Sequence, residues 1–63
     1  MSPQAFRLWL IEMKSADLAR SDAECGRLLG RSADQIVRYK QTGADMVIAL
    51  ACRALLHRLE PYK

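Results

Sequence analysis

The sequence predicts an all-α fold, a compact four-helix domain with a central helix-turn-helix. Of the 63 residues, 51% are hydrophobic and 27% are charged, a composition that excludes a disordered polar segment and fits a helical bundle. Two helix-start signals lie close together in the middle of the chain, one on each side of a glycine. The length fits one domain, 1–63, near the lower limit for autonomous folding, so we also expect burial through a two-fold dimer.

The helix-turn-helix is predicted in the stretch 22–41. Two serines are each followed three residues later by Glu or Gln, the spacing in which a cap and the third helical residue satisfy each other's backbone amides. These pairs are Ser21 with Glu24 and Ser32 with Gln35. They predict helices over about 22–29 and 33–40. Gly30 lies between them, where a chain leaving a helix often takes the left-handed conformation that suits glycine.

Apolar residues at helical spacing predict that these two helices share a buried seam. The seam contains Cys25, Leu29, Ile36 and Tyr39. Gly26 is next to it, and the lack of a side chain there lets the second helix cross close to the first. Glycine also weakens the first helix by roughly 1 kcal/mol relative to alanine. The pattern therefore predicts two short helices in tight contact.

The order of these residues resembles the phage-repressor-like (Cro/Xre) helix-turn-helix family. The resemblance is carried by Gly26, Leu29, Gly30, Ser32, Ile36 and Tyr39, followed by Thr42 and Gly43. The chain departs from the family pattern at Gly26, where alanine is usual, at Lys40, where glutamate is frequent, and at Asp22, where many relatives have a glutamine that supports DNA contacts. The resemblance implies a DNA-binding domain in which 33–40 is the recognition helix.

The basic residues favour double-stranded DNA as the partner. The net charge is +3 and the pI is about 9.2, an excess that an ordinary solvated surface would also explain. Clustering of the basic residues in or beside the motif favours a polyanion instead. We expect contacts to DNA phosphates from Arg20, Arg27, Arg31, Ser32 and Lys40. Such contacts supply affinity and salt sensitivity without reading sequence.

Base contacts are expected from the side of the second motif helix that the seam leaves free. The candidates are Ala33, Asp34, Gln35, Val37 and Arg38. Arg38 suits a bidentate contact to guanine, and Val37 and Ala33 suit thymine methyl groups. Gln35 either reads adenine or is occupied as a capping partner. Asp34 either accepts from cytosine or stabilises the positive end of its helix.

A first helix over about 3–19 is predicted to pack behind the motif. Ser2 is its expected cap, and Pro3 takes the first helical position, where a missing N–H costs no hydrogen bond. Its apolar residues at helical spacing are Phe6, Trp9, Leu10 and Met13. Leu18 is expected to close the gap to the motif. For Trp9 a core position is favoured over an exposed interface anchor.

The last helix is predicted over about 45–59, ending before Pro61. Its apolar surface is too wide for one small core, because two apolar stripes run along it. One stripe is Val47, Leu50, Ala51 and Ala54, and the other is Ile48, Cys52, Leu55, Leu56 and Leu59. We expect the second stripe to form the homodimer interface. In the alternative, the first helix alone covers both stripes.

The sequence gives no indication of an enzyme, a cofactor or a small-molecule ligand. Cys25 and Cys52 lie on apolar helix faces without metal-ligand or C-x-x-C spacing, so buried free thiols in a reducing compartment are expected. His57 is the single histidine, which leaves too few ligands for a zinc site. The longest apolar run, 46–52, is too short to cross a bilayer, so we expect a soluble, cytoplasmic protein with no membrane partner.

Together these features predict a sequence-specific, double-stranded DNA-binding transcriptional regulator. The family resemblance implies an autoregulatory repressor of a phage or mobile-element operon. As a homodimer it is expected to bind a palindromic operator with half-sites about one helical turn apart. The alternative is a small helical interaction module, an antitoxin or inhibitor, that docks a protein through the apolar last helix.

Overall fold

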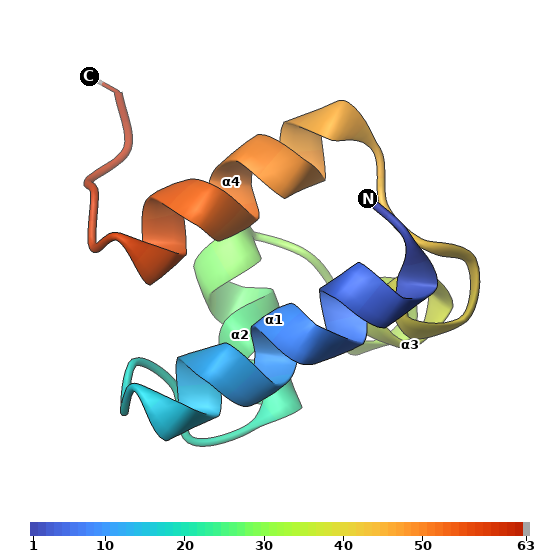
Figure 1. Cartoon of the computed structure of the whole chain (residues 1–63), viewed down its shortest axis with the longest axis horizontal. Helices are drawn as coiled ribbons and strands as arrows, with labels where there is room; N and C mark the ends of the chain where they lie inside the picture. Colours follow the sequence, from blue (N-terminus) through green and yellow to red (C-terminus); the bar gives the residue numbers. More distant parts are fainter. Residues whose placement is uncertain (63) are drawn as a thin grey trace.

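The computed structural model, which describes residues 1–62, contains four α-helices and no strand in that range (Figure 1). The helices are α1 (Pro3–Ser15), α2 (Asp22–Leu29), α3 (Ala33–Thr42) and α4 (Met46–Leu56). The predicted all-α fold is confirmed, and each helix begins within one residue of its expected start. The predictions for the other ends are less accurate: α3 is slightly longer than expected, and α1 and α4 are shorter.

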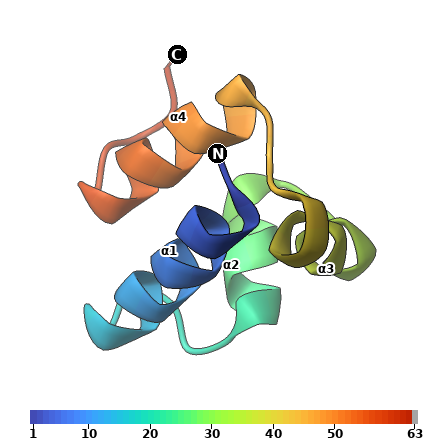
Figure 2. The same ribbon diagram turned by 45° about the vertical axis from the view of Figure 1, so that its right-hand side comes forward.

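The helices α1 and α2 form the centre of the molecule, because each of them contacts every other helix, whereas α3 and α4 contact only this pair. Figure 2 shows α3 and α4 held apart from each other. The buried apolar core includes Phe6, Trp9, Leu10, Met13, Ala19, Cys25, Leu29, Ile36, Ile48 and Cys52. Both α3 and α4 therefore place one face on a shared core and direct another face away from it.

The first helix begins as expected and ends earlier than expected. The Ser2 hydroxyl accepts a hydrogen bond from the backbone N–H of Ala5 at 3.0 Å. The predicted end near residue 19 is wrong, because Asp17 adopts a left-handed conformation with φ 59°. The N–H of Leu18 then bonds to the Met13 carbonyl at 2.9 Å. This closure turns Leu18 back against the core, where it is partly buried as expected.

The last helix ends in the same way. The predicted extension to residue 59 is wrong, because Arg58 has φ 59°. The N–H of Leu59 bonds to the Ala54 carbonyl at 2.9 Å, which satisfies a carbonyl at the helix end. At the other end, the Asp45 carboxylate caps α4 by accepting from the Ile48 N–H at 3.0 Å. The helix is therefore shorter and more sharply bounded than its apolar pattern predicts.

Trp9 connects α1 to α4 from within the core. Its indole Nε1 donates to the Cys52 carbonyl oxygen at 2.9 Å, so the buried N–H has a partner. Its ring centroid lies 5.5 Å from that of Phe6. The Phe6 ring contacts Tyr39 of α3 edge to face, with 5.4 Å between centroids. The core position favoured for Trp9 is therefore confirmed.

The expected dimer stripe on α4 requires correction. Ile48 and Cys52 are buried in the core of the single chain, so neither is available to a partner. Leu55 and Leu56 are partly buried against the same core. Of the five residues, only Leu59 is well exposed, and it lies beyond the end of the helix. The stripe faces inward because it is the one that meets α1 and α2.

Candidate nucleic-acid interface

The corner between α2 and α3 has the predicted backbone. Gly30 is left-handed, with φ 67° and ψ 34°. Its N–H bonds to the Arg27 carbonyl at 3.1 Å, and the N–H of Arg31 bonds to the Gly26 carbonyl at 2.9 Å. A β-carbon at Gly30 would meet no atom within 4 Å, so glycine is favoured here by backbone conformation and not by crowding.

Gly26 is required for the close approach of the two helices. A β-carbon added there would lie 3.0 Å from Cγ1 of Ile36 and 3.1 Å from the carbonyl oxygen of Arg31. Both distances are tighter than ordinary van der Waals contact. Cys25, Leu29 and Ile36 are buried around this contact, as the predicted seam requires.

The capping box at the start of α3 occupies Gln35 in the free protein. The Ser32 hydroxyl accepts from the Gln35 backbone N–H at 3.2 Å, and Oε1 of Gln35 accepts from the Ser32 N–H at 3.1 Å. The Ser32 hydroxyl also donates to this oxygen at 3.3 Å. A bidentate adenine contact by Gln35 would have to break the box. The capping alternative is therefore the one that the structure favours.

The side of α3 that faces away from the core carries the remaining predicted base contacts. Ala33, Asp34, Val37 and Arg38 are all exposed. Ile36 is buried, and Val37 beside it is 51% exposed, so α3 rests on the core by one narrow face. The helix runs two residues beyond its predicted end, and Oγ1 of Thr42 donates to the Arg38 carbonyl at 3.0 Å. This bond uses only the backbone carbonyl of Arg38, and the exposed Arg38 side chain lies on an open helix surface.

Most of the predicted phosphate contacts are also accessible. Arg20, Arg27, Arg31 and Ser32 are exposed. Arg31 places Nη1 at 3.2 Å from the Gly30 carbonyl oxygen, which keeps it close to the α2–α3 corner. Arg20 precedes the start of α2, Arg27 lies in its last turn and Arg31 directly follows the corner, so the exposed basic side chains are distributed along the motif. Such a surface favours an anionic partner.

Lys40 has a different environment from the other predicted phosphate contacts. Its Nζ lies 3.0 Å from Oδ2 of Asp22, and its backbone carbonyl accepts a hydrogen bond from Arg7. The side chain thus connects α3 to α2, and the backbone connects α3 to α1. In the free protein the ammonium group of Lys40 is therefore paired, and the predicted phosphate contact would have to compete with Asp22 for it.

Asp22 accepts from lysines on two other helices. Its Oδ1 lies 2.9 Å from Nζ of Lys14, in addition to the Oδ2 contact with Lys40. The hydrogen bond from Lys14, followed by that from Lys40, holds the pKa of Asp22 below its usual value, although partial burial acts in the opposite direction. The same contact raises the pKa of Lys14. This three-helix cluster was not predicted, because its members have no local spacing that indicates pairing.

The two cysteines are free, buried thiols, as predicted. Burial raises the pKa of both, and that of Cys52 reaches about 12, with a smaller effect from Cys25. Burial therefore disfavours the thiolate, which is the reactive form, at both positions. Within residues 1–62, no group of three His, Cys, Asp or Glu side chains is placed to hold a metal ion.

Comparison with protein-family models, curated proteins and solved structures found no match. Among the described residues, no helix has the length and apolar character needed to span a membrane.

Proposed function

We propose that this chain is a sequence-specific, double-stranded DNA-binding transcriptional regulator in which α2 and α3 form a helix-turn-helix. The observation that carries the proposal is the outward face of α3. Asp34, Val37 and Arg38 are exposed there, on a helix held against α1 and α2 by its opposite face. A rigid helix with a free polar and basic side is the element that a major groove accepts.

Arg38 is the principal base contact in this proposal. Its guanidinium presents parallel donors that match guanine O6 and N7, and such a pair contributes about 1–3 kcal/mol of discrimination. Val37 and Ala33 supply apolar contacts to thymine methyl groups. Asp34 lies in the first turn of α3, where its carboxylate stabilises the helix N-terminus. It also lies within the reading face, where cytosine N4 is a suitable donor.

Phosphate contacts come from the exposed arginines beside the motif, Arg20, Arg27 and Arg31. The backbone N–H groups at the start of α3 add a favourable site for a phosphate, because the positive end of the helix lies there. Lys40 is left out of this set because Asp22 already pairs with it. These contacts position α3 and make binding sensitive to salt.

The proposal includes a homodimer on a palindromic operator, with half-site centres about 34–36 Å apart. The resemblance to the phage-repressor-like family extends it to an autoregulatory repressor of a phage or mobile-element operon. The proposal places the protein in a reducing, cytoplasmic setting, and the two unpaired thiols are consistent with it.

Selection of bound sequences from a random duplex library tests this proposal directly. We expect an enriched palindrome with guanine at the position that Arg38 reads. Arg38→Ala should weaken binding to that sequence by about 1–3 kcal/mol per half-site and relax the preference for guanine. Arg31→Ala should weaken binding to all duplexes alike. Arg58→Asn, which removes a charge outside the motif and suits a left-handed backbone, should leave binding unchanged.

A helical interaction module is the second candidate function. It is favoured by the exposed apolar residues Met46, Val47 and Leu50 at the start of α4. For an antitoxin or inhibitor of this kind, Arg38→Ala would leave the affinity for the protein target unchanged. Failure of the library to enrich any sequence, together with no retardation of random duplex at low salt, would reject DNA binding and favour this candidate.

A further inference from the structure

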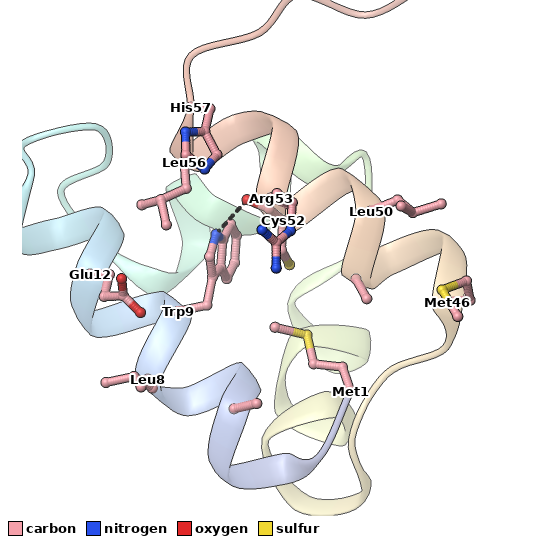
Figure 3. Close-up of a pocket in the computed structure, with 12 residues that line it drawn as sticks. Met1, Leu8, Trp9, Glu12, Met46, Leu50, Cys52, Arg53, Leu56 and His57 are labelled. Carbon is pink, nitrogen blue, oxygen red and sulfur yellow. Dashed lines mark hydrogen bonds between the residues drawn. The ribbon is translucent and has the colours of Figure 1, made fainter.

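An open groove of about 570 Å³ lies between α1 and α4 (Figure 3). Small side chains, Ala5 and Ala49, line part of it, and larger apolar side chains border it. Leu8 of α1 is 56% exposed, and Met46 and Leu50 of α4 are 72% and 62% exposed. An apolar surface of this kind, shared by two neighbouring helices, marks a place where another helix packs.

Besides His57, the groove is lined by one carboxylate and one guanidinium group, which lie on opposite walls. Glu12 comes from α1 and Arg53 from α4, and Figure 3 shows them on the two sides of the opening. Both are exposed, and the ion pairs found between residues 1–62 are those of Asp22, which involve neither. The N-terminal ammonium group of Met1 is occupied by the Ala44 carbonyl at 3.0 Å. Within the described chain, Glu12 and Arg53 therefore balance each other in charge without forming an ion pair.

We propose that the occupant of this groove is a second copy of the same chain, related by a two-fold axis. In a two-fold interface, every contact between two different residues occurs twice, once in each direction. Glu12 of each copy therefore faces Arg53 of the other. The apolar start of α4, including Leu50, then packs into the groove of the neighbouring copy. The inference specifies the partner surface of the homodimer in the proposed function, but it does not depend on DNA binding.

Charge argues for a second copy over other occupants. For a nucleic acid or an anionic ligand, attraction by Arg53 would be opposed by repulsion from Glu12, and a purely apolar ligand would leave both charged side chains unpaired. A copy of this chain supplies an opposite charge to each of them and apolar side chains to the rest of the groove. No residue of α3 lines the groove, so the proposed recognition face stays free in the dimer.

The oligomeric state in the absence of DNA is the first test. Sedimentation of the full chain at tens of micromolar should give twice the mass of one chain, which is 7.1 kDa. Leu50→Glu should shift the protein to monomer, with dimerisation at least about tenfold weaker, because it places a charge in the apolar contact. The matched control is Leu28→Glu, which alters an exposed leucine of α2 outside the groove and should leave the dimer intact.

A charge exchange tests the register of the two copies. Glu12→Arg and Arg53→Glu should each give monomers, because like charges then face each other twice in the two-fold pair. An equimolar mixture of the two variants should form a heterodimer, because both contacts become attractive again. The double variant with both changes should recover the homodimer. Circular dichroism of each variant confirms that the helices persist.

A wild-type chain that stays monomeric at these concentrations would overturn the inference. So would a dimer that resists Leu50→Glu, or single charge variants whose mixture stays monomeric. The DNA proposal has an independent readout, since Arg38→Ala changes duplex binding without touching the groove. A groove-dependent dimer that binds no duplex would therefore reject the proposed function and leave this inference standing.

Discussion

The outer helices α3 and α4 pack on the same central pair but present opposite kinds of surface. α3 buries Ile36 and exposes a side with Asp34, Arg38 and other polar groups, which water solvates well. α4 buries Ile48 and exposes Met46, Val47 and Leu50, which water does not. This difference is the reason that DNA is proposed as the partner of α3 and a second copy of the chain as the partner of α4. Because the two helices do not touch, each surface can be altered without changing the other.

Truncation of the buried isoleucines should have the largest effect and should be alike on both helices. Ile36→Ala and Ile48→Ala each remove a side chain that is 2% exposed. The expected loss is about 2–5 kcal/mol of unfolding free energy, measured by urea denaturation followed by circular dichroism. In a domain this small, either variant is expected to be largely unfolded at 37 °C.

The neighbouring valines provide the controls, because each is adjacent in sequence to one of the isoleucines but lies on the exposed face of its helix. Val37→Ala and Val47→Ala should change the free energy of unfolding by no more than about 0.5 kcal/mol in the monomer. If Val37→Ala proved as damaging as Ile36→Ala, the outward face of α3 would be covered by protein, and the contrast between the two helices would fail.

The ends of the helices should respond to substitution by smaller amounts and with opposite signs. Gly30→Ala forces a β-carbon into a left-handed backbone and should cost about 1–2 kcal/mol. Arg58→Gly relieves the same strain at the end of α4 and should stabilise the fold by up to about 1 kcal/mol. Thermal unfolding of the two variants beside the wild type measures both effects, and equal signs would contradict the strain assigned to Arg58.

The contrast between Gly30 and Arg58 also explains which helix ends could be predicted. Gly30 is a residue whose type indicates a left-handed conformation, so the corner between α2 and α3 was placed correctly from the sequence. Asp17 and Arg58 adopt similar conformations with a weaker indication or none, because aspartate tolerates a positive φ better than most residues but also occurs widely elsewhere, and arginine has no such preference. Each is followed by a leucine whose N–H closes the preceding helix. At Leu18 that closure is supported by packing on the core, which is a tertiary contact that local patterns do not contain.

The misassigned dimer stripe has a related origin. Helical periodicity identified two apolar stripes on α4 but contained no information on which one meets α1. The hydrogen bond from Trp9 to the Cys52 carbonyl helps to determine which stripe faces α1, and it joins residues 43 positions apart. The same holds for the ion pair of Lys40 with Asp22, which crosses the fold and was not predicted. Local signals therefore predicted the outward face of α3 well and the outward face of α4 poorly.

The smallest expected effect concerns the ion pairs of Asp22 with Lys14 and Lys40. They join α3 to α1 and α2 and include no residue of α4. Asp22 has a lowered pKa in the folded chain, so its contribution to stability is present above its usual pKa of 3.8 and is lost as the pH falls through the lowered value. Lys14 has a raised pKa, so its contribution is present below 10.5 and is lost at higher pH. Asp22→Asn should therefore reduce the urea midpoint modestly at pH 7.

At acidic pH the difference between Asp22→Asn and the wild type should disappear, because the wild-type carboxylate is then protonated as well. High salt at pH 7 should reduce the difference too, since the three side chains are partly exposed and their charges are screened. A difference that stayed constant from pH 7 to pH 2 would mean that Asp22 acts through shape or helix capping alone. In that case its charge would not be what ties α3 to the central helices, and Lys40 would again be available to a DNA phosphate.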